Sequence, residues 1–427
     1  MSDFTTPPPA RQPGRAAFSF IFITVTLDFL AFGIIAPVLP KLIIQFEGGN
    51  IARAAAIVGY FGFGWGAMQF LFSPILGAWS DRFGRRPVIL LSCAGLGLDY
   101  ILMALSPSLG WLFLGRLISG ITSSNISSAF AYVTDVTPPE RRAKQFGLLS
   151  AAFGLGFIIG PAAGGLLGGI HLRLPFWVAA GLSLTNALYG FFILPESLPL
   201  ERRAKSAWHM ANPLGSLTLL GSKPGLGVLA FITTLNYLGQ QSLPSIFVLY
   251  VDYRYGWSAR MIGFALAVVG VSVSVVSAGL VGPFVKRFGE RGGLIFGLLI
   301  GAVAFCGFAL ASHAWILFAA IPLLALWGIS GPAVQSLMTQ RVDPTSQGKL
   351  QGAINSIRGI TTMFGPLLFT QVLAAAISPT VGLYLPGAPY FLAAFLLFSS
   401  VILAHYATRP SSLPAASQPA ASLNPSD

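Results

Sequence analysis

The chain has 427 residues, of which 54% are hydrophobic and 9% charged, and its mean hydropathy is +0.75. Soluble domains carry about 25% charged residues, so this composition excludes an ordinary water-soluble protein. The net charge of +12 does not indicate a nucleic-acid partner, because the basic residues sit in short loops between apolar runs and not on one solvated face. Membrane topology explains that placement better.

Apolar runs long enough to cross the hydrocarbon core, about 20 residues each, recur along nearly the whole chain. We therefore expect an all-α membrane protein. Loops, prolines and charges predict twelve transmembrane helices at 17–40, 54–79, 87–106, 110–133, 146–169, 174–194, 225–250, 259–285, 292–311, 314–339, 348–377 and 387–406.

The segments outside these spans have a different composition. Residues 1–16 are polar and rich in proline, and residues 407–427 have the Pro, Ser and Ala bias of a disordered tail. The two cysteines, Cys93 and Cys306, lie inside apolar runs and give no disulfide framework.

Basic residues are unevenly divided between the two sets of loops. The tails and the loops after even-numbered spans hold eighteen Lys and Arg residues, the opposite loops hold five, and Arg116 and Arg358 lie within spans. The positive-inside rule therefore predicts that both termini are cytoplasmic.

A repeat appears when the chain is shifted against itself by 205 residues. GAWSDRFGRR at 77–86 then aligns with GPFVKRFGER at 282–291, and the Gly-Pro step at 160–161 aligns with the one at 365–366. One offset that serves separate regions indicates duplication. We expect two six-helix bundles, 17–194 and 225–406, joined by a charged cytoplasmic loop at 195–224.

Two such bundles around a midplane cavity describe the major facilitator architecture, and the resemblance covers residues 17–406. The string DRFGRRPV, together with GxxxGPxxGG in span 5, resembles the drug and proton antiporter branch. LDFLAFGIIAPVLP, SCAGLGLDYILMALS and LGRLISGIT resemble the tetracycline efflux family.

This resemblance implies a proton-coupled antiporter in the cell inner membrane that works as a monomer. It would export an amphipathic, drug-like compound, with tetracycline among the candidates, by alternating access. Its partners would be a small-molecule substrate, protons and the lipid bilayer.

The turn between spans 2 and 3, called here the charged turn, gathers charge in a weakly charged chain. We expect its first glycine to let span 2 approach a neighbour closely, its acid to cap the next helix, and its arginines to hold the turn in the cytoplasm. The family resemblance also implies a conformational latch. The residues concerned are Gly77, Asp81, Arg82, Gly84, Arg85 and Arg86. Because Lys286 replaces the acid in the second half, the latch is expected mainly in the first.

Span 5 carries glycines at four-residue spacing, Gly156, Gly160 and Gly164, with Pro161 and Gly165 beside them. Small residues on one helix face permit close packing in lipid, and packing alone would explain the glycines. The full string resembles the signature of exporters that exchange substrate for protons.

Four ionisable residues fall deep in spans: Asp28, Asp99, Arg116 and Arg358. Such charges are costly in lipid and usually face a cavity or a partner. Asp99 and Arg116 lie at similar depths, so they are interpreted first as a structural or gating ion pair, with a direct proton carrier as the alternative.

Asp28 lies near the middle of span 1, where desolvation favours the neutral carboxyl. We expect it to take part in proton coupling; the alternative is a protonated acid that is hydrogen-bonded to a neighbouring helix. Arg358 could face the cavity, helix carbonyls, a lipid head group or an anionic or zwitterionic group of the substrate.

Two departures from the family pattern concern the substrate. The tetracycline efflux family has polar residues in spans 8 and 9 that matter for coupling and for the metal-drug chelate, and those positions fall on Val273 and Gly301. The match therefore supports proton-linked export more firmly than tetracycline itself. Candidates for lining the cavity are Gln69, Asn125, Gln241, Gln335, Phe61 and Trp65.

Other functions leave weaker traces in the sequence. No GxxxxGK[ST] loop is present, so a self-contained ATP-driven pump is excluded, whereas an importer or facilitator of a sugar or metabolite and a non-transporting receptor remain as alternatives. The four histidines are scattered without metal-ligand spacing. We expect no enzyme, no metal site and no cofactor.

Overall fold

The computed structural model describes residues 15–123, 126–204, 215–222, 225–379, 381–382 and 384–409. Parts of the predicted tails and central loop, 1–14, 205–214, 223–224 and 410–427, lie outside these residues. The α-helices are α1 (Arg15–Ile35), α2 (Leu39–Phe46), α3 (Ile51–Phe83), α4 (Arg85–Leu105), α5 (Leu109–Thr122), α6 (Ile126–Val136), α7 (Pro139–Gly168), α8 (Leu174–Ile193), α9 (Thr218–Ser222), α10 (Leu226–Gln240), α11 (Ser242–Tyr255), α12 (Ala259–Val275), α13 (Val281–Leu310), α14 (Ala314–Leu326), α15 (Ser330–Thr339), α16 (Gln347–Ile377) and α17 (Ala388–Ala407).

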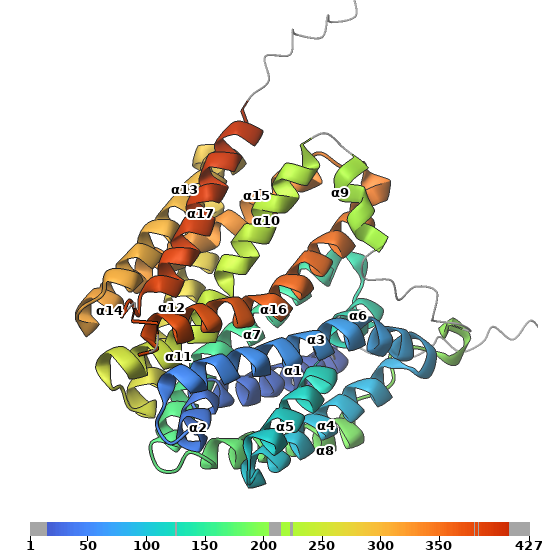
Figure 1. Ribbon diagram of the computed structural model, residues 1–427. Coiled ribbons are helices and arrows are strands. Elements are labelled where there is room, and N and C mark those ends of the chain that lie inside the picture. The colour runs from blue at the N-terminus through green and yellow to red at the C-terminus, as the bar shows by residue number, and fades with distance from the viewer. Residues whose placement is uncertain are drawn as a thin grey trace, which may run out of the picture.

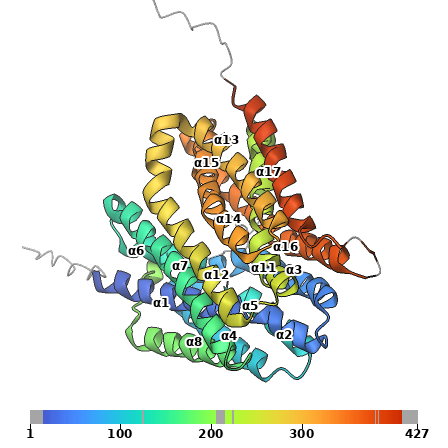
Figure 2. The ribbon, with the colours of Figure 1, turned by 90° about the vertical axis from the view of Figure 1, so that its left-hand side faces the viewer.

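Among the described residues, nine helical stretches are long and apolar enough to cross a bilayer. One of them, 259–310, turns back at Gly289, whose φ of 71° is non-helical, and so makes two crossings (Figure 2). The helix pairs α5 and α6, and α10 and α11, supply the remaining two spans. The described residues therefore contain helices for all twelve predicted spans.

Span 1 differs in detail from its prediction. It breaks between α1 and α2 because Pro37 has no N–H to continue the helix, and α2 then runs on to Phe46, beyond the predicted end at Pro40.

The helices form two bundles with matching internal contacts (Figure 1). In the N-terminal bundle α1 packs on α7, α3 on α5 and α4 on α8; in the C-terminal bundle α10 packs on α16, α12 on α14 and α13 on α17. The tight turns match as well, since Gly84 (φ 107°) and Gly289 (φ 71°) are 205 residues apart. This pairing is what a duplicated six-helix unit predicts.

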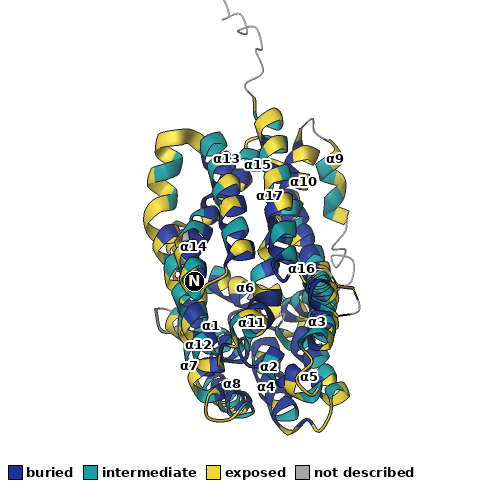
Figure 3. Cartoon of the chain, turned by 60° about the vertical axis from the view of Figure 1, so that its left-hand side comes forward, coloured by how far each residue is buried: buried dark blue, intermediate teal, exposed yellow. Residues whose placement is uncertain are grey.

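The outer surface suits lipid. Leu91, Leu98 and Leu105, seven residues apart on α4, are 60%, 62% and 61% exposed, and exposed residues cover the outer faces of many helices (Figure 3). A repeat of seven residues is close to two helical turns, so these leucines form an apolar stripe on the outside of the bundle.

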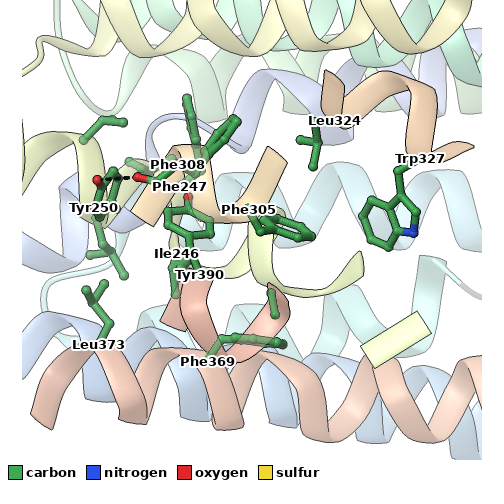
Figure 4. Close-up of a cluster of buried hydrophobic side chains, with 14 of the residues drawn as sticks. Ile246, Phe247, Tyr250, Phe305, Phe308, Leu324, Trp327, Phe369, Leu373 and Tyr390 are labelled. Carbon is green, nitrogen blue, oxygen red and sulfur yellow. Dashed lines mark hydrogen bonds between the residues drawn. The ribbon is translucent and has the colours of Figure 1, made fainter. Parts of the chain in front are cut away.

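The C-terminal bundle has an aromatic core (Figure 4). Tyr390 of α17 lies between Phe305 and Phe308 of α13, and Tyr250 of α11 donates a hydrogen bond of 2.7 Å to the Phe308 carbonyl. The ring contacts of Tyr390 and the hydrogen bond of Tyr250 fix α11, α13 and α17 relative to one another.

The bundles meet along two helix pairs, called here the α3–α16 seam and the α7–α12 seam. In the first, a Cβ added at Gly62 would lie 2.5 Å from Pro366 Cβ; in the second, one added at Gly165 would lie 2.8 Å from Gly263 Cα. Glycine permits both close approaches.

Both seams stop before the end of the molecule that carries the basic loops, called here the basic end. A Cβ at Gly77 of α3 or at Gly147 of α7 would meet nothing within 4 Å. The bundles therefore separate toward the basic end, as Figure 1 shows on the side of α6 and α9. The close approach expected at Gly77 is absent from this conformation.

An ion pair joins the bundles at the opposite end. Lys41 of α2 donates 2.6 Å hydrogen bonds to Asp252 Oδ1 of α11 and to the Trp257 carbonyl. Both charged side chains are largely buried.

Candidate functional site

Asp28 lies inside the N-terminal bundle, between α1, α4 and α8. Asn186 of α8 donates a 3.0 Å hydrogen bond to its carboxylate, and the Cys93 thiol of α4 lies 3.7 Å from both carboxylate oxygens. Asn186 and Cys93 are buried, while Asp28 is partly exposed. Asp28 thus has a fixed orientation and is not fully buried.

Asn186 was not predicted from the sequence. Its amide also donates to the Thr24 carbonyl at 3.0 Å, so it bridges the backbone of α1 and the Asp28 side chain. An amide in an otherwise apolar run was the only available signal.

Asp99 and Arg116 lie near each other without forming the predicted ion pair. Both are buried, each contributes to the electrostatic environment of the other, and no ion pair of 4.0 Å or less joins them among the described residues. The Arg116 guanidinium instead lies 5.4 Å from the centre of the Trp65 ring, a cation–π distance. The prediction of direct contact between Asp99 and Arg116 is wrong because equal depth along two helices does not fix the direction of their side chains.

Five aromatic residues form a continuous strip across α1, α3 and α7, called here the aromatic strip. Successive ring centroids are 4.6 to 6.2 Å apart, in the order Phe29, Phe153, Phe157, Phe32 and Trp65. The strip connects α7, a helix of the α7–α12 seam, through α1 to α3, a helix of the α3–α16 seam.

Arg358 of α16 is exposed and is oriented by one tyrosine. Its Nη2 donates a 3.3 Å hydrogen bond to the Tyr237 hydroxyl of α10, and its guanidinium lies 5.0 Å from the centre of that ring. Among the alternatives for Arg358, the structure therefore shows a side-chain partner and not a helix carbonyl.

The predicted cavity residues have different environments. Gln335 of α15 is exposed and donates a 3.3 Å hydrogen bond to Gln351, Gln241 packs against Gly365, and Gln69 is partly exposed. Asn125 lies outside the described residues.

Phe61 and Gly301 are both in packed surroundings. Phe61 is 5% exposed with its ring 5.1 Å from that of Phe113, so it belongs to the bundle core and not to an open surface. A Cβ at Gly301 would lie 2.7 Å from the indole of Trp327. Trp327 thus fills the space that a polar side chain would need there, whereas Val273 is 42% exposed.

The charged turn forms its ion pairs within the N-terminal bundle. Arg85 contacts Asp81 and Asp135, the latter at 3.2 Å, and donates to Ser80 Oγ at 3.1 Å. Arg82 and Arg86 lie over the rings of Phe83 and Phe191.

The prediction that Asp81 caps α4 is wrong. The backbone N–H groups of Arg85 and Arg86 donate to Glu196 at 2.9 and 3.3 Å. Glu196 belongs to the segment after α8, and Gly84 packs directly against its carboxylate. Asp81, in the last turn of α3, is instead held by Arg85, the first residue of α4.

The glycines of α7 serve two different contacts. Gly156, Gly160 and Gly164 pack on α1, where a Cβ at Gly160 would lie 2.6 Å from Gly33 Cα. Pro161 and Gly165 face α12 across the seam, against Gly263. Residues 156–165 of α7 thus pack against α1 of their own bundle with one face and against α12 of the other bundle with the adjacent face.

The described residues contain no group of three or more His, Cys, Asp or Glu side chains that could hold a metal ion.

A family model described as Major Facilitator Superfamily matches residues 21–366, and matches again over residues 229–425. The chain belongs to the major facilitator superfamily. As a member of that superfamily it is a multi-pass membrane protein and a transporter rather than an enzyme.

Relatives of this facilitator include several tetracycline resistance proteins. The class C protein of Escherichia coli is 39% identical over 383 residues, which cover 88% of this chain and 94% of that protein. The class B protein of Escherichia coli is 37% identical and covers 82% of this chain and 86% of its own length. This facilitator therefore belongs to the family of these resistance proteins, and the likeness supports drug efflux over import of a sugar or metabolite.

Solved structures share the fold. The nucleoside transporter NupG superposes with a TM-score of 0.72 at 14% identity, over 92% of this chain and 98% of that one. The human organic anion transporter MFSD10 superposes with a TM-score of 0.67 at 24% identity, over 92% and 99%. At these identities the likeness concerns the fold alone.

Proposed function

We propose that this protein exports an amphipathic, drug-like compound in exchange for protons, by alternating access between its two bundles. The observation that carries the proposal is Asp28, a partly exposed intramembrane carboxylate held by Asn186. An acid in this setting can bind and release a proton as its solvent exposure changes.

The basic end is assigned to the cytoplasm by the positive-inside rule, which places both termini there. The described conformation is then open toward the cytoplasm and closed at the outer face by Lys41 and Asp252. A substrate would enter between the separated ends of the seams.

Proton binding and substrate binding are coupled because both affect the ionised state of Asp28. Loss of the proton from Asp28 leaves a carboxylate in a poorly solvated place, and substrate occupancy then changes the free energy of that charge. Conformational switching exposes Asp28 to the opposite face, where the more acidic compartment reloads it. The proton gradient is the energy source and the working unit is one chain.

The charged turn is assigned a latch role in the same cycle. In the cytoplasm-open conformation its charges are held by Asp135 and Glu196 of its own bundle. When the seams close at the basic end, Gly77 and Asp81 are brought toward the C-terminal bundle.

Tetracycline is one candidate substrate because of the resistance proteins that this chain resembles. Val273 and Gly301 replace polar residues of the family pattern, so a related amphipathic compound fits the sequence better than the metal chelate.

The proposal is tested by expression in a drug-sensitive bacterial host that lacks its own pumps, with a panel of drugs that includes tetracycline. Resistance is expected to rise for at least one drug, to collapse on addition of a proton uncoupler, and to be lost with Asp28→Asn. Glu201→Gln, at an exposed acid of the linker, is the control and keeps the resistance. Undiminished proton-driven export by Asp28→Asn would remove Asp28 from the mechanism.

A further inference from the structure

Arg358 belongs to a polar stripe on α16. Gln351, Asn355 and Arg358 are all exposed and are spaced four and three residues apart, which places them on one helix face. Gln351 accepts from Gln335 of α15, and Arg358 donates to Tyr237 of α10. The stripe therefore runs beside two other helices of the C-terminal bundle.

The remaining faces of α16 locate this stripe. One face packs on α3 through Gly359, Met363 and Pro366. The side beyond it carries Ile360 and the exposed Phe364, which suits lipid. The polar stripe lies on the other side of the α3 contact, so it faces the space between the two bundles.

The chemistry of the pair suits an anion. Among the described residues, no carboxylate lies within 4.0 Å of Arg358, and Tyr237 is the side chain to which it donates. The guanidinium keeps further N–H donors, and the Tyr237 hydroxyl, which accepts from Arg358, keeps its own hydrogen to donate. Donors of this kind bind a carboxylate or sulfonate through charge-assisted hydrogen bonds.

The aromatic strip ends at Trp65 of α3, the helix that packs on α16. Gly359, next to Arg358, lies against the ring of Phe70, and Trp65 is five residues from Phe70 on α3. The apolar strip and the cationic donor group thus involve the two helices of one seam.

We propose that Arg358 and Tyr237 bind the anionic group of an amphipathic substrate whose apolar body lies on the aromatic strip. This assignment deepens the proposed export function and rests on it for its role in transport. It requires the substrate to carry a negative charge, and so favours organic anions over cationic compounds of the same shape.

The test compares three probes with the same ring system and different charge: 2-naphthoate, 2-naphthamide and 2-naphthylmethylamine. Binding to the full chain in lipid nanodiscs is measured by calorimetry, with empty nanodiscs as the blank. The carboxylate is expected to bind about tenfold more tightly than the amide, a difference typical of one charge-assisted contact, and the amine more weakly than the amide.

Three variants locate the preference. Arg358→Gln is expected to reduce carboxylate binding to the level of the amide while leaving amide binding unchanged, which also shows that the variant is folded. Arg358→Lys keeps part of the preference, because the charge remains without the planar fork. Arg260→Gln, at an exposed arginine of α12, makes the same change in net charge. This variant is expected to keep the full preference for the carboxylate over the amide.

The proposal is overturned if none of the probes binds, if the amide binds as tightly as the carboxylate, or if the preference survives Arg358→Gln. Because binding is measured without a proton gradient, these outcomes are separate from the resistance assay with Asp28→Asn. The anion-binding proposal can therefore fail while the export proposal holds, and the export proposal can fail while the anion-binding proposal holds.

Discussion

A single carboxylate, that of Glu196, accepts hydrogen bonds from four backbone N–H groups. Two belong to Arg85 and Arg86 at the start of α4, and two to Ser197 and Leu198 in the segment that leaves the N-terminal bundle. An acid at a helix N-terminus satisfies otherwise unpaired donors and interacts favourably with the helix dipole. Glu196 thereby ties the beginning of the linker to the charged turn.

Glu196→Ala is expected to destabilise this facilitator by about 1 kcal/mol, the usual cost of losing an N-terminal cap. The result is a lower midpoint of thermal unfolding for the detergent-solubilised chain. Glu201→Ala, a neighbouring exposed acid, is expected to leave the midpoint unchanged. Equal midpoints for the two variants would contradict the capping role.

The candidate site could be predicted only in part from the sequence. The cost of charge in lipid marked Asp28, Asp99, Arg116 and Arg358, because that cost depends on residue type and depth alone. Their partners depend on helix rotation and on contacts between residues far apart in the chain, as with Arg358 and Tyr237, 121 residues apart. The cap of α4 by Glu196, 110 residues from Arg86, could likewise not be predicted from the sequence.

Helix α7 shows how one element serves two partners. Gly160 and Gly164 lie against α1, while Gly165 lies against Gly263 of α12. The equivalent step in α16 does the same, with Gly365 against Gln241 of its own bundle and Pro366 against Gly62 of the other. The spacing of the glycines predicted a close-packed face; the second contact, across the seam, follows only from the assembled pair of bundles.

Gly160→Ala is expected to destabilise the facilitator by roughly 1–3 kcal/mol, because its methyl group would force α1 and α7 apart. Gly181→Ala on α8 is the matched control, since a Cβ there meets nothing within 4 Å. That change is expected to leave the unfolding midpoint equal or higher, as alanine is the better helix former. A Gly160→Ala midpoint at or above that of Gly181→Ala would contradict the packing role.

At the scale of the whole molecule, one cross-bundle ion pair accompanies the closed end. Lys41 and Asp252 are 17% and 15% exposed, and Lys41 also donates a hydrogen bond to the Trp257 carbonyl. The repeat and the spans predicted two bundles, because duplication and hydrophobic length are properties of sequence. The conformation could not be predicted, since alternative states share one sequence and differ in which seam contacts form.

Lys41→Met is expected to favour the conformation that opens at this end, by roughly 1 kcal/mol or about fivefold in population. Spin labels placed on α2 and α11 would report a larger fraction of long distances. Asp252→Asn should act in the same direction, and the double variant should add little to either single change. Arg53→Gln, an exposed residue of the same end, serves as the control, and an identical shift with it would show a general charge effect.

Gly77 and Gly147 have room for a side chain in the described conformation, yet each stands where a seam helix continues past its last contact. The absence of a side chain at these positions is therefore not required in this conformation. It would be required only when the two bundles come together at the basic end. Bulky side chains at these two positions should leave folding unchanged and should hold the transporter open at the basic end.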